Sequence, residues 1–421
     1  MTDTAPPSEG LDDNAIAASL LRMGLIGGGE RPFCRPLEGG VSSEIWLIEL
    51  PGRRFCVKRA LPRLKVAQLW EAPVTRNRHE YAWFETAGGI CPDAVPPLLG
   101  EDAAAGLFAM EYLDPAQYPL WKNQLRDGHA DPATAATVGS RLAQIHASTA
   151  GDPHIARSFA TDENFYAIRL EPYLIATARA HPDLAGELQR LAEVTAATRL
   201  ALVHGDVSPK NILVGPQGPV FLDAECAWYG DPAFDLTFCL NHLLLKCLWA
   251  PYAAAGFLAC FDRLADTYLD AVAWEPRTVI EARAARLLPG LFLARIDGKS
   301  PVEYITAEAD KARARRVARA LLAEPVERLS AVRAVWAQEL RVGPTRRSSP
   351  SAAGGSGIRA GGRPSRPSCV SPVAPAAARS RRPARRPVRA RRSNCATAAT
   401  SSAAATCSVP LPRSMARSPP R

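Results

Sequence analysis

The sequence predicts an α+β fold in two parts: a small antiparallel sheet that carries one helix, and a larger part that is mostly helical. Two observations lead to this prediction. Short apolar segments separated by glycines occupy residues 31–112, as in strands joined by tight turns. From Asp131 onward, apolar residues instead recur with helical spacing. Beyond Val342 the composition changes to Ser, Pro, Ala, Arg and Gly, and we expect a disordered tail because large apolar residues are scarce there.

The first part contains five strand-like segments and one helical segment. A helix is expected from Arg76 to Ala87, ending at Gly88 and Gly89. Residues 1–30 are expected to form a loose leader with a short helix around residues 14–23. The strands are expected at residues 32–37, 45–50, 54–59, 95–99 and 107–112.

The second part is helical except at its centre. Val138, Leu142 and Ile145 lie on one face of a predicted helix, and helical patterns resume from Phe234 to about Leu340. The apolar stretch at residues 234–250 is interrupted by polar residues, which indicates a buried helix and not a membrane span. Two short strands are expected between these helical regions, at residues 212–214 and 220–222. The predicted divisions of the chain are residues 1–30, 31–112, 113–342 and 343–421.

Charge is distributed unevenly along the 421 residues. The net charge is +9, but residues 341–421 contain 17 Arg and no Lys, Asp or Glu, so the remainder carries −8. A basic tail can bind nucleic acid or an acidic membrane, although this one has no aromatic residue to stack on bases. The abrupt change of composition favours another interpretation, an aberrant extension such as a frame-shifted reading of GC-rich DNA.

The strongest chemical signal is the segment from Leu202 to Val214. His204, Asp206 and Asn211 lie in a loop before an apolar strand, and Asp223 follows the next strand. Phosphoryl transfer needs a carboxylate to orient the attacking hydroxyl, and oxygen ligands that hold Mg²⁺ on the phosphates. Asp206 can accept the hydroxyl proton, while Asn211 and Asp223 can hold the metal. A β-hairpin between them would bring the two metal ligands together.

These residues resemble the catalytic core of the protein-kinase-like superfamily. The segments at residues 204–211, 222–225 and 230–236 are similar to the aminoglycoside phosphotransferase and choline kinase-like branch, and methylthioribose kinases are similar as well. The resemblance covers about residues 31–322. It implies a two-lobe fold with a nucleotide-binding N-lobe and a helical C-lobe, with ATP and Mg²⁺ as cofactors and a small hydroxylated molecule as substrate.

Two departures from protein kinases favour a small substrate. At the position of Gly205, many protein kinases have an Arg that binds a phosphorylated activation loop. Only seven residues separate Asp223 from Asp231, which leaves little room for such a loop. We therefore expect a constitutively assembled site.

The resemblance also implies a nucleotide site in the N-lobe. Lys58 would contact the α- and β-phosphates, and Glu80 would hold Lys58 in place. The alternatives are an exposed lysine on an edge strand and a solvated helix carboxylate. Glycines between the first two strands would approach the phosphates, although a plain hairpin turn explains them equally well. Backbone atoms after the fifth strand would meet adenine. The nucleotide-binding residues predicted in this way are Gly39, Gly40, Ser42, Lys58, Glu80, Glu111 and Leu113.

Other polar residues have less certain roles. In the wider superfamily an Asp at the position of Asp235 braces the catalytic loop, and the alternative is a carboxylate stabilised by a helix dipole. Glu225 can serve a second metal ion or a structural role. His146 and His242 lie in apolar helical patterns, so we interpret both as packed core histidines.

The sequence therefore predicts an ATP- and Mg²⁺-dependent kinase for an aminoglycoside-like antibiotic, a sugar or an amino alcohol. The alternatives are a catalytically silent nucleotide-binding protein on the same fold, and nucleic-acid binding through the basic tail. The acidic body suits a cationic substrate only weakly. Residues 1–30 lack the apolar run of a signal peptide, so we expect a cytoplasmic location and no membrane partner.

Overall fold

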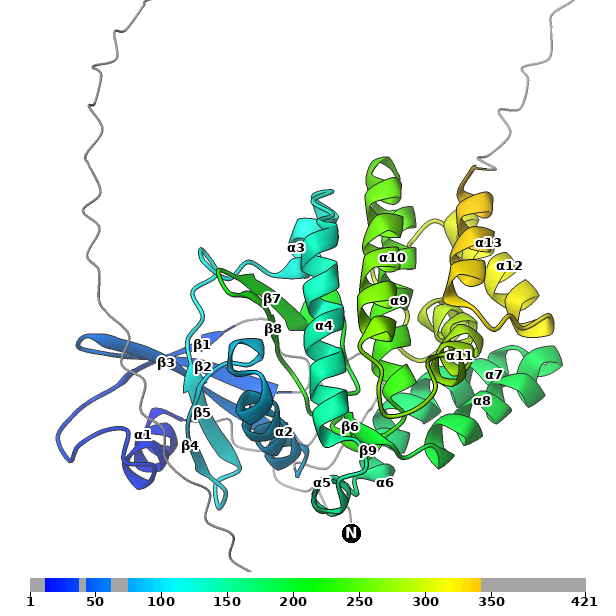
Figure 1. The fold of residues 1–421 in the computed structure, drawn as a ribbon. Helices are drawn as coiled ribbons and strands as arrows, with labels where there is room; N and C mark the ends of the chain where they lie inside the picture. The colour runs from blue at the N-terminus through cyan, green and yellow to red at the C-terminus, as the bar shows by residue number, and fades with distance from the viewer. Residues whose placement is uncertain (1–11, 38–42, 62–74, 342–421) are drawn as a thin grey trace, which may run out of the picture. The chain divides into compact units, whose positions relative to one another are not determined.

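The computed structural model describes residues 12–37, 43–61 and 75–341 (Figure 1). All of them belong to one compact unit, residues 1–347. They form a small antiparallel-sheet lobe and a larger helical lobe, which confirms the predicted fold class. The predictions made for Gly39, Gly40, Ser42 and the tail at residues 343–421 lie outside the described residues.

The N-lobe is built on a five-stranded sheet in the order β1-β2-β3-β5-β4, with every pairing antiparallel. The central strand β3 carries Lys58, which lies opposite Ile45 on one neighbour and Phe108 on the other. Lys58 is therefore on a central strand and not on an edge strand. The strands are β1 (Phe33–Leu37), β2 (Ser43–Leu50), β3 (Arg53–Ala60), β4 (Leu98–Asp102) and β5 (Leu107–Glu111).

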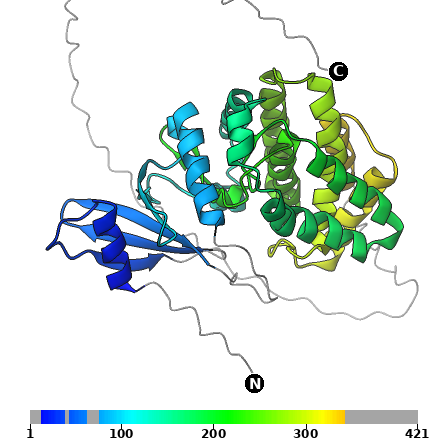
Figure 2. The ribbon, with the colours of Figure 1, turned by 90° about the horizontal axis from the view of Figure 1, so that it is seen from below.

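One face of this sheet is covered by α1 (Asp13–Arg22), as Figure 2 shows. Ile16 and Leu20 are fully buried against apolar residues of β2, β3 and β5. The hydroxyl of Ser19 donates to Asp102 on β4 at 2.6 Å. The short helix predicted around residues 14–23 is confirmed, and it packs on the sheet of the N-lobe instead of lying in a loose leader.

The other face of the sheet packs against α2 (Arg76–Ile90), which buries Trp83. This helix runs through Gly88 and Gly89, where the sequence predicted its end. A β-carbon on Gly88 would lie 3.0 Å from the Val95 side chain, so glycine permits close packing there and does not stop the helix. A short 3₁₀ turn after α2 moves the start of β4 three residues beyond its predicted position.

Helices make up most of the C-lobe. Val138, Leu142 and Ile145 are fully buried on α4, as predicted. Every residue of α9 except Trp249 is buried, which confirms the buried-helix interpretation. Tyr166–Ile175 forms a π-helical segment that leads into α7. The helices are α3 (Trp121–Arg126), α4 (Pro132–Thr149), α5 (Pro153–Ser158), α6 (Asp162–Phe165), α7 (Ala176–Ala180), α8 (Ala185–Ala197), α9 (Pro232–Trp249), α10 (Ala254–Asp270), α11 (Arg277–Asp297), α12 (Glu308–Ala323) and α13 (Leu329–Arg341).

Two short antiparallel strand pairs lie at the centre of the C-lobe. The pair β7 (Ile212–Gly215) and β8 (Gly218–Phe221) is the predicted hairpin. The pair β6 (Ala201–Val203) and β9 (Trp228–Gly230) was not predicted, because three-residue strands are too short to show a period. In the described part of the chain no single helix is long and apolar enough to cross a membrane, and α9 with α10 reaches that length only across a bend of 120°.

Candidate active site

Three segments that are distant in sequence meet at Lys58. Its ammonium lies 2.7 Å from Oε1 of Glu80 on α2 and 2.6 Å from Oδ1 of Asp223, which follows β8. The predicted Lys58–Glu80 ion pair is thus confirmed. Asp223 has a φ of +66°, a left-handed conformation that non-glycine residues seldom adopt. Such strain is typical of residues that the surrounding structure holds in place for a function.

The charges in this cluster stabilise one another. Burial alone would lower the pKa of Lys58, but the carboxylates of Asp223 and Glu80 reverse the shift and raise it. Burial would likewise raise the pKa of Asp223, but the ammonium groups of Lys58 and Lys210 hold it below its ordinary value. Lys58 and Asp223 are therefore ionised at neutral pH, and form an ion pair.

Asp206 lies in the loop between β6 and β7 and is buried. Its Oδ2 atom is 2.8 Å from the guanidinium of Arg169 and 3.1 Å from the ammonium of Lys210. Its Oδ1 atom is buried and has no hydrogen-bond partner within the described residues. A buried carboxylate oxygen without a partner is costly, so Oδ1 is the atom free to accept a proton from a bound hydroxyl.

Asn211 lies close to Asp206, because its amide nitrogen donates to the Asp206 carbonyl at 3.1 Å. This bond leaves the amide oxygen of Asn211 available to a cation. Lys210 interacts electrostatically with both Asp206 and Asp223, so the two carboxylates border the same space. An amide oxygen and a carboxylate are ligands of the kind that Mg²⁺ prefers, and the pair Asn211 and Asp223 therefore fits that ion.

The loop between β6 and β7, which carries Asp206, is held through its backbone by Asp235 in the first turn of α9. The amides of His204 and Gly205 donate to its two carboxylate oxygens at 2.7 and 2.8 Å. This confirms the predicted bracing role. His146 lies 3.2 Å from Asp235 and 2.8 Å from the hydroxyl of Tyr268, so it is a buried core histidine, as predicted.

Residues 34–265 match the family model described as "Phosphotransferase enzyme family" (APH). This match covers more than half of the chain. The chain belongs to this family. Among curated proteins it is similar to methylthioribose kinase 1 of Oryza sativa subsp. japonica, 27% identical over 224 residues, which are 45% of this chain and 50% of that protein. It is also similar to methylthioribose kinase of Erwinia tasmaniensis, 28% identical over 227 residues, which are 47% of this chain and 56% of that protein. The chain thus spans about half the length of the curated relatives it matches.

Solved structures resemble this phosphotransferase-family chain at lower identity. A choline/ethanolamine kinase family protein from Mesorhizobium loti matches with a TM-score of 0.43 and 16% identity, covering 77% of this chain and 98% of that one. An aminoglycoside phosphotransferase from Alicyclobacillus acidocaldarius matches with a TM-score of 0.39 and 16% identity, covering 80% of this chain and 98% of that one.

Gly205 is required by the catalytic loop of this phosphotransferase-family member. Its φ is +79°, and a β-carbon there would lie 2.7 Å from the β-carbon and from the carbonyl oxygen of Cys226. Its own carbonyl accepts a hydrogen bond from Arg169. No side chain fits this position without displacing the backbone at Cys226.

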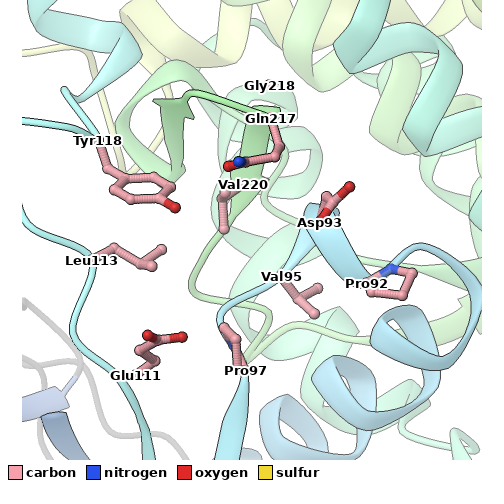
Figure 3. A pocket seen from close by; sticks show the side chains of 10 residues that line it. All are labelled: Pro92, Asp93, Val95, Pro97, Glu111, Leu113, Tyr118, Gln217, Gly218 and Val220. Atoms are coloured by element: carbon pink, nitrogen blue, oxygen red, sulfur yellow. The ribbon is translucent and has the colours of Figure 1, made fainter.

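Of the two predicted adenine-binding residues, Glu111 ends β5 and Leu113 lies on the connection that leaves it. They line a hollow, shown in Figure 3, between that connection, the segment before β4 and the β7–β8 hairpin. The amide of Glu111 donates to the Pro97 carbonyl at 2.9 Å, so that N–H is not available to a base. Adenine contact by the backbones of Glu111 and Leu113 remains a prediction. The hollow is lined by Pro92, Asp93, Val95, Pro97, Glu111, Leu113, Tyr118, Gln217, Gly218 and Val220.

Glu225 is buried and lies 2.8 Å from Nε of Arg76 at the start of α2. Burial and the charge of Asp223 raise its pKa. The ion pair ties the C-lobe to α2, and it supports the structural role over the second metal site.

Sequence reasoning missed the cations that hold these carboxylates. Lys210 follows Asp206 by four residues, so its charge and spacing gave a usable signal. Arg169 lies on the π-helical segment far upstream of Asp206, and no local pattern marks it. Arg76 was predicted only as the first residue of a helix.

Proposed function

We propose that this chain transfers the γ-phosphoryl group of ATP, with Mg²⁺, to a hydroxyl group of a small molecule. The observation that carries the proposal is Asp206 Oδ1, a buried carboxylate oxygen without a hydrogen-bond partner in the described chain. The side-chain nitrogen of Asn211 donates to the backbone carbonyl of the same Asp206. The Lys58–Asp223 pair supplies the second half of a phosphoryl-transfer site.

Each residue has a distinct task in this proposal. Asp206 orients the acceptor hydroxyl and takes its proton through Oδ1, while Arg169 and Lys210 hold Oδ2. Lys58, held by Glu80, binds the nucleotide phosphates. When bound, Mg²⁺ neutralises phosphate charge, and Asn211 and Asp223 would hold it.

The loop with Gly39, Gly40 and Ser42 would cover the phosphates. In support, the first described residue after it, Ser43, has a buried hydroxyl without a hydrogen-bond partner in the described structure. That hydroxyl is a donor available to a bound phosphate.

The names of the similar proteins suggest which classes of acceptor to test first. The matched curated proteins are named for methylthioribose, and the structural neighbours include proteins named for choline, ethanolamine and aminoglycosides. We therefore propose a sugar, an amino alcohol or an aminoglycoside-like compound as the acceptor class. A cytoplasmic location and the absence of a nucleic-acid partner belong to the same proposal.

The test is a screen of the purified full chain against a panel of hydroxylated metabolites and antibiotics, with ATP consumption and phosphorylated product both measured. We expect Mg²⁺-dependent product with at least one acceptor. Calorimetric titration of ATP with and without Mg²⁺ provides the control. Tight Mg²⁺-dependent ATP binding without any product would favour the catalytically silent alternative, and no ATP binding would refute both.

A further inference from the structure

A stripe of side chains on α9 leads away from the catalytic loop. Phe238, His242 and Lys246 recur every four residues, so they share one face of the helix. The Phe238 ring lies 5.7 Å from the guanidinium of Arg169, the residue that holds Asp206. Its centroid is 5.5 Å from that of the His242 ring. The stripe therefore starts beside the catalytic carboxylate and ends at Lys246.

Lys246 is a buried lysine, and none of the carboxylates that the structure describes forms an ion pair with it. It is 1% exposed, and its ammonium lies 4.0 Å from the centroid of the Trp249 ring and 3.7 Å from that of the Tyr304 ring. No hydrogen bond or ion pair joins it to any other residue that the structure describes. Aromatic faces attract an ammonium group, but they leave its three N–H donors unsatisfied, which is costly for a buried charge.

The groups around Lys246 are mostly cationic. Lys122 on α3 and Arg295 on α11 both add positive charge. Arg295 is buried and, in the described chain, pairs with no carboxylate; it contacts Tyr173 and Ser300 instead. Among the described residues Glu303 is the acidic group that raises the pKa of Lys246, and it already forms an ion pair with Lys122.

Unsatisfied polar atoms gather at the same place. Nε2 of His242, the hydroxyl of Tyr304 and Nε of Arg295 are buried, and within the described residues they have no hydrogen-bond partner. Burial and then the charge of Lys122 lower the pKa of Lys246 to about 6. Burial, Arg295 and Lys246 lower the pKa of His242 as well. An anion bound here would satisfy these donors and reverse the shift at Lys246.

We propose that the phosphoryl acceptor carries an anionic substituent, such as a carboxylate, which binds to the ammonium of Lys246 beside Trp249 and Tyr304 while the acceptor hydroxyl lies at Asp206. This rests on the proposed phosphotransferase function and narrows its substrate class. Although residues 1–340 carry a net charge of −8, the local cluster is positive and would repel a polycationic acceptor.

The dimensions suit a small molecule. Phe238 and Lys246 are eight residues apart, which corresponds to about 12 Å along the helix. A molecule with a hydroxyl at one end and an anion at the other can span this distance.

The test uses three probes that share a six-carbon polyol chain: gluconate with a carboxylate, sorbitol without charge, and glucamine with an ammonium. Dissociation constants are measured by calorimetry on the full chain at matched ionic strength. We expect gluconate to bind at least about tenfold more tightly than sorbitol, the effect of one charge-assisted hydrogen bond, and glucamine to bind more weakly still. Equal binding of the three, stronger binding of glucamine or no binding of gluconate would overturn the proposal.

Variants locate the effect at Lys246. Lys246→Met should abolish the preference for gluconate, whereas Lys299→Met, which removes a surface lysine paired with Glu171, should retain it. A preference that survives Lys246→Met would overturn the assignment. In case this variant fails to fold, the same preference in the wild type must weaken as the pH rises above 6, because the free ammonium loses its proton. A preference that does not change with pH would count against Lys246.

Failure of this proposal is distinguishable from failure of the proposed function. If ATP and Mg²⁺ still support phosphorylation of uncharged or cationic acceptors, the function stands and only the anionic substrate class is lost. If no acceptor is phosphorylated but gluconate still binds through Lys246, the binding site stands and the kinase function is lost.

Discussion

Each lobe contains a buried lysine, and the surroundings of the two lysines shift their pKa values in opposite directions. Lys58 on β3 contacts two carboxylates, and its pKa is raised. Lys246 on α9 contacts two aromatic rings and no carboxylate in the described structure, and its pKa is lowered to about 6. Burial is nearly equal in the two cases, so the partners decide the charge. The first lysine belongs to a complete ionic cluster, and the second is in a cluster that an anionic ligand would complete.

The largest effect is expected at Asp206, the carboxylate that we propose takes the proton of the acceptor hydroxyl. Asp206→Asn should lower kcat by about 10²–10⁴, because a positioned general base is lost, while ATP still binds. Steady-state kinetics and calorimetry measure the two quantities. Asp270→Asn removes a carboxylate from an exposed pair with Arg277 and should leave kcat unchanged. Near-normal turnover of Asp206→Asn would remove Asp206 from the mechanism.

The stability of the two lysine-to-methionine variants compares the clusters directly. Lys58→Met leaves the buried Glu80 and the partly exposed Asp223 without the cation between them, and should lower the free energy of unfolding by about 3 kcal/mol. Lys246→Met replaces a buried amine, which forms no ion pair with any described carboxylate, with an apolar side chain, and should change that free energy by less than about 1 kcal/mol or increase it. The free energy of unfolding of both variants is measured by urea denaturation and compared with that of the wild type. A loss of similar size in both would mean that Lys246 has a stabilising partner.

The pH dependence of stability should separate the lysines further. Between pH 6 and the ordinary lysine pKa of 10.5, the unfolded chain keeps the proton on Lys246 and the folded chain does not. The contribution of Lys246 to stability therefore rises with pH across this window, with a slope of at most about 1 kcal/mol per pH unit, and is constant below pH 6. Lys58, whose pKa is raised, contributes no slope there. The difference in unfolding free energy between wild type and Lys246→Met, measured at several pH values, should follow this curve, and a flat difference would contradict it.

The smallest effect is expected from the part of the chain that belongs to neither cluster. Truncation after Val342 removes a segment with 16 Arg and few large apolar residues, a composition from which we expect little buried surface. The melting temperature and kcat/KM should be unchanged at moderate salt, and kcat/KM should rise at low salt if the basic tail screens the acidic body. A large drop in melting temperature would show that the tail is part of the fold.

The sequence predicted the site best where its residues are joined by short, regular connections. His204, Asp206 and Asn211 share one loop, and the hairpin that follows carries the chain to Asp223. Lys58 and Glu80 lie on a strand and on the next helix, an arrangement that the resemblance implied.

Contacts that depend on long-range packing could not be predicted. Arg169 reaches Asp206 from a π-helical segment, and hydrophobic periodicity does not indicate which way such a segment turns its side chains. In the sequence Lys246 only interrupts an apolar stretch. Whether such a lysine reaches solvent, a carboxylate or an aromatic pair depends on the segments that cover it, which for Lys246 include Tyr304.

α9 carries Asp235 in its first turn and Lys246 in its last, and the two residues are separated by about 16 Å of helix axis. The N-terminal end of α9 positions the loop that carries Asp206, and its C-terminal end carries the lysine that we propose binds the anion. Because a buried helix does not change its length, the distance between the phosphorylated oxygen and the anionic group is set in advance. Anionic compounds too short to reach Asp206 would occupy the Lys246 end without reacting, so truncated analogues of the true acceptor should act as competitive inhibitors, and the chain length at which inhibition gives way to turnover would measure the site.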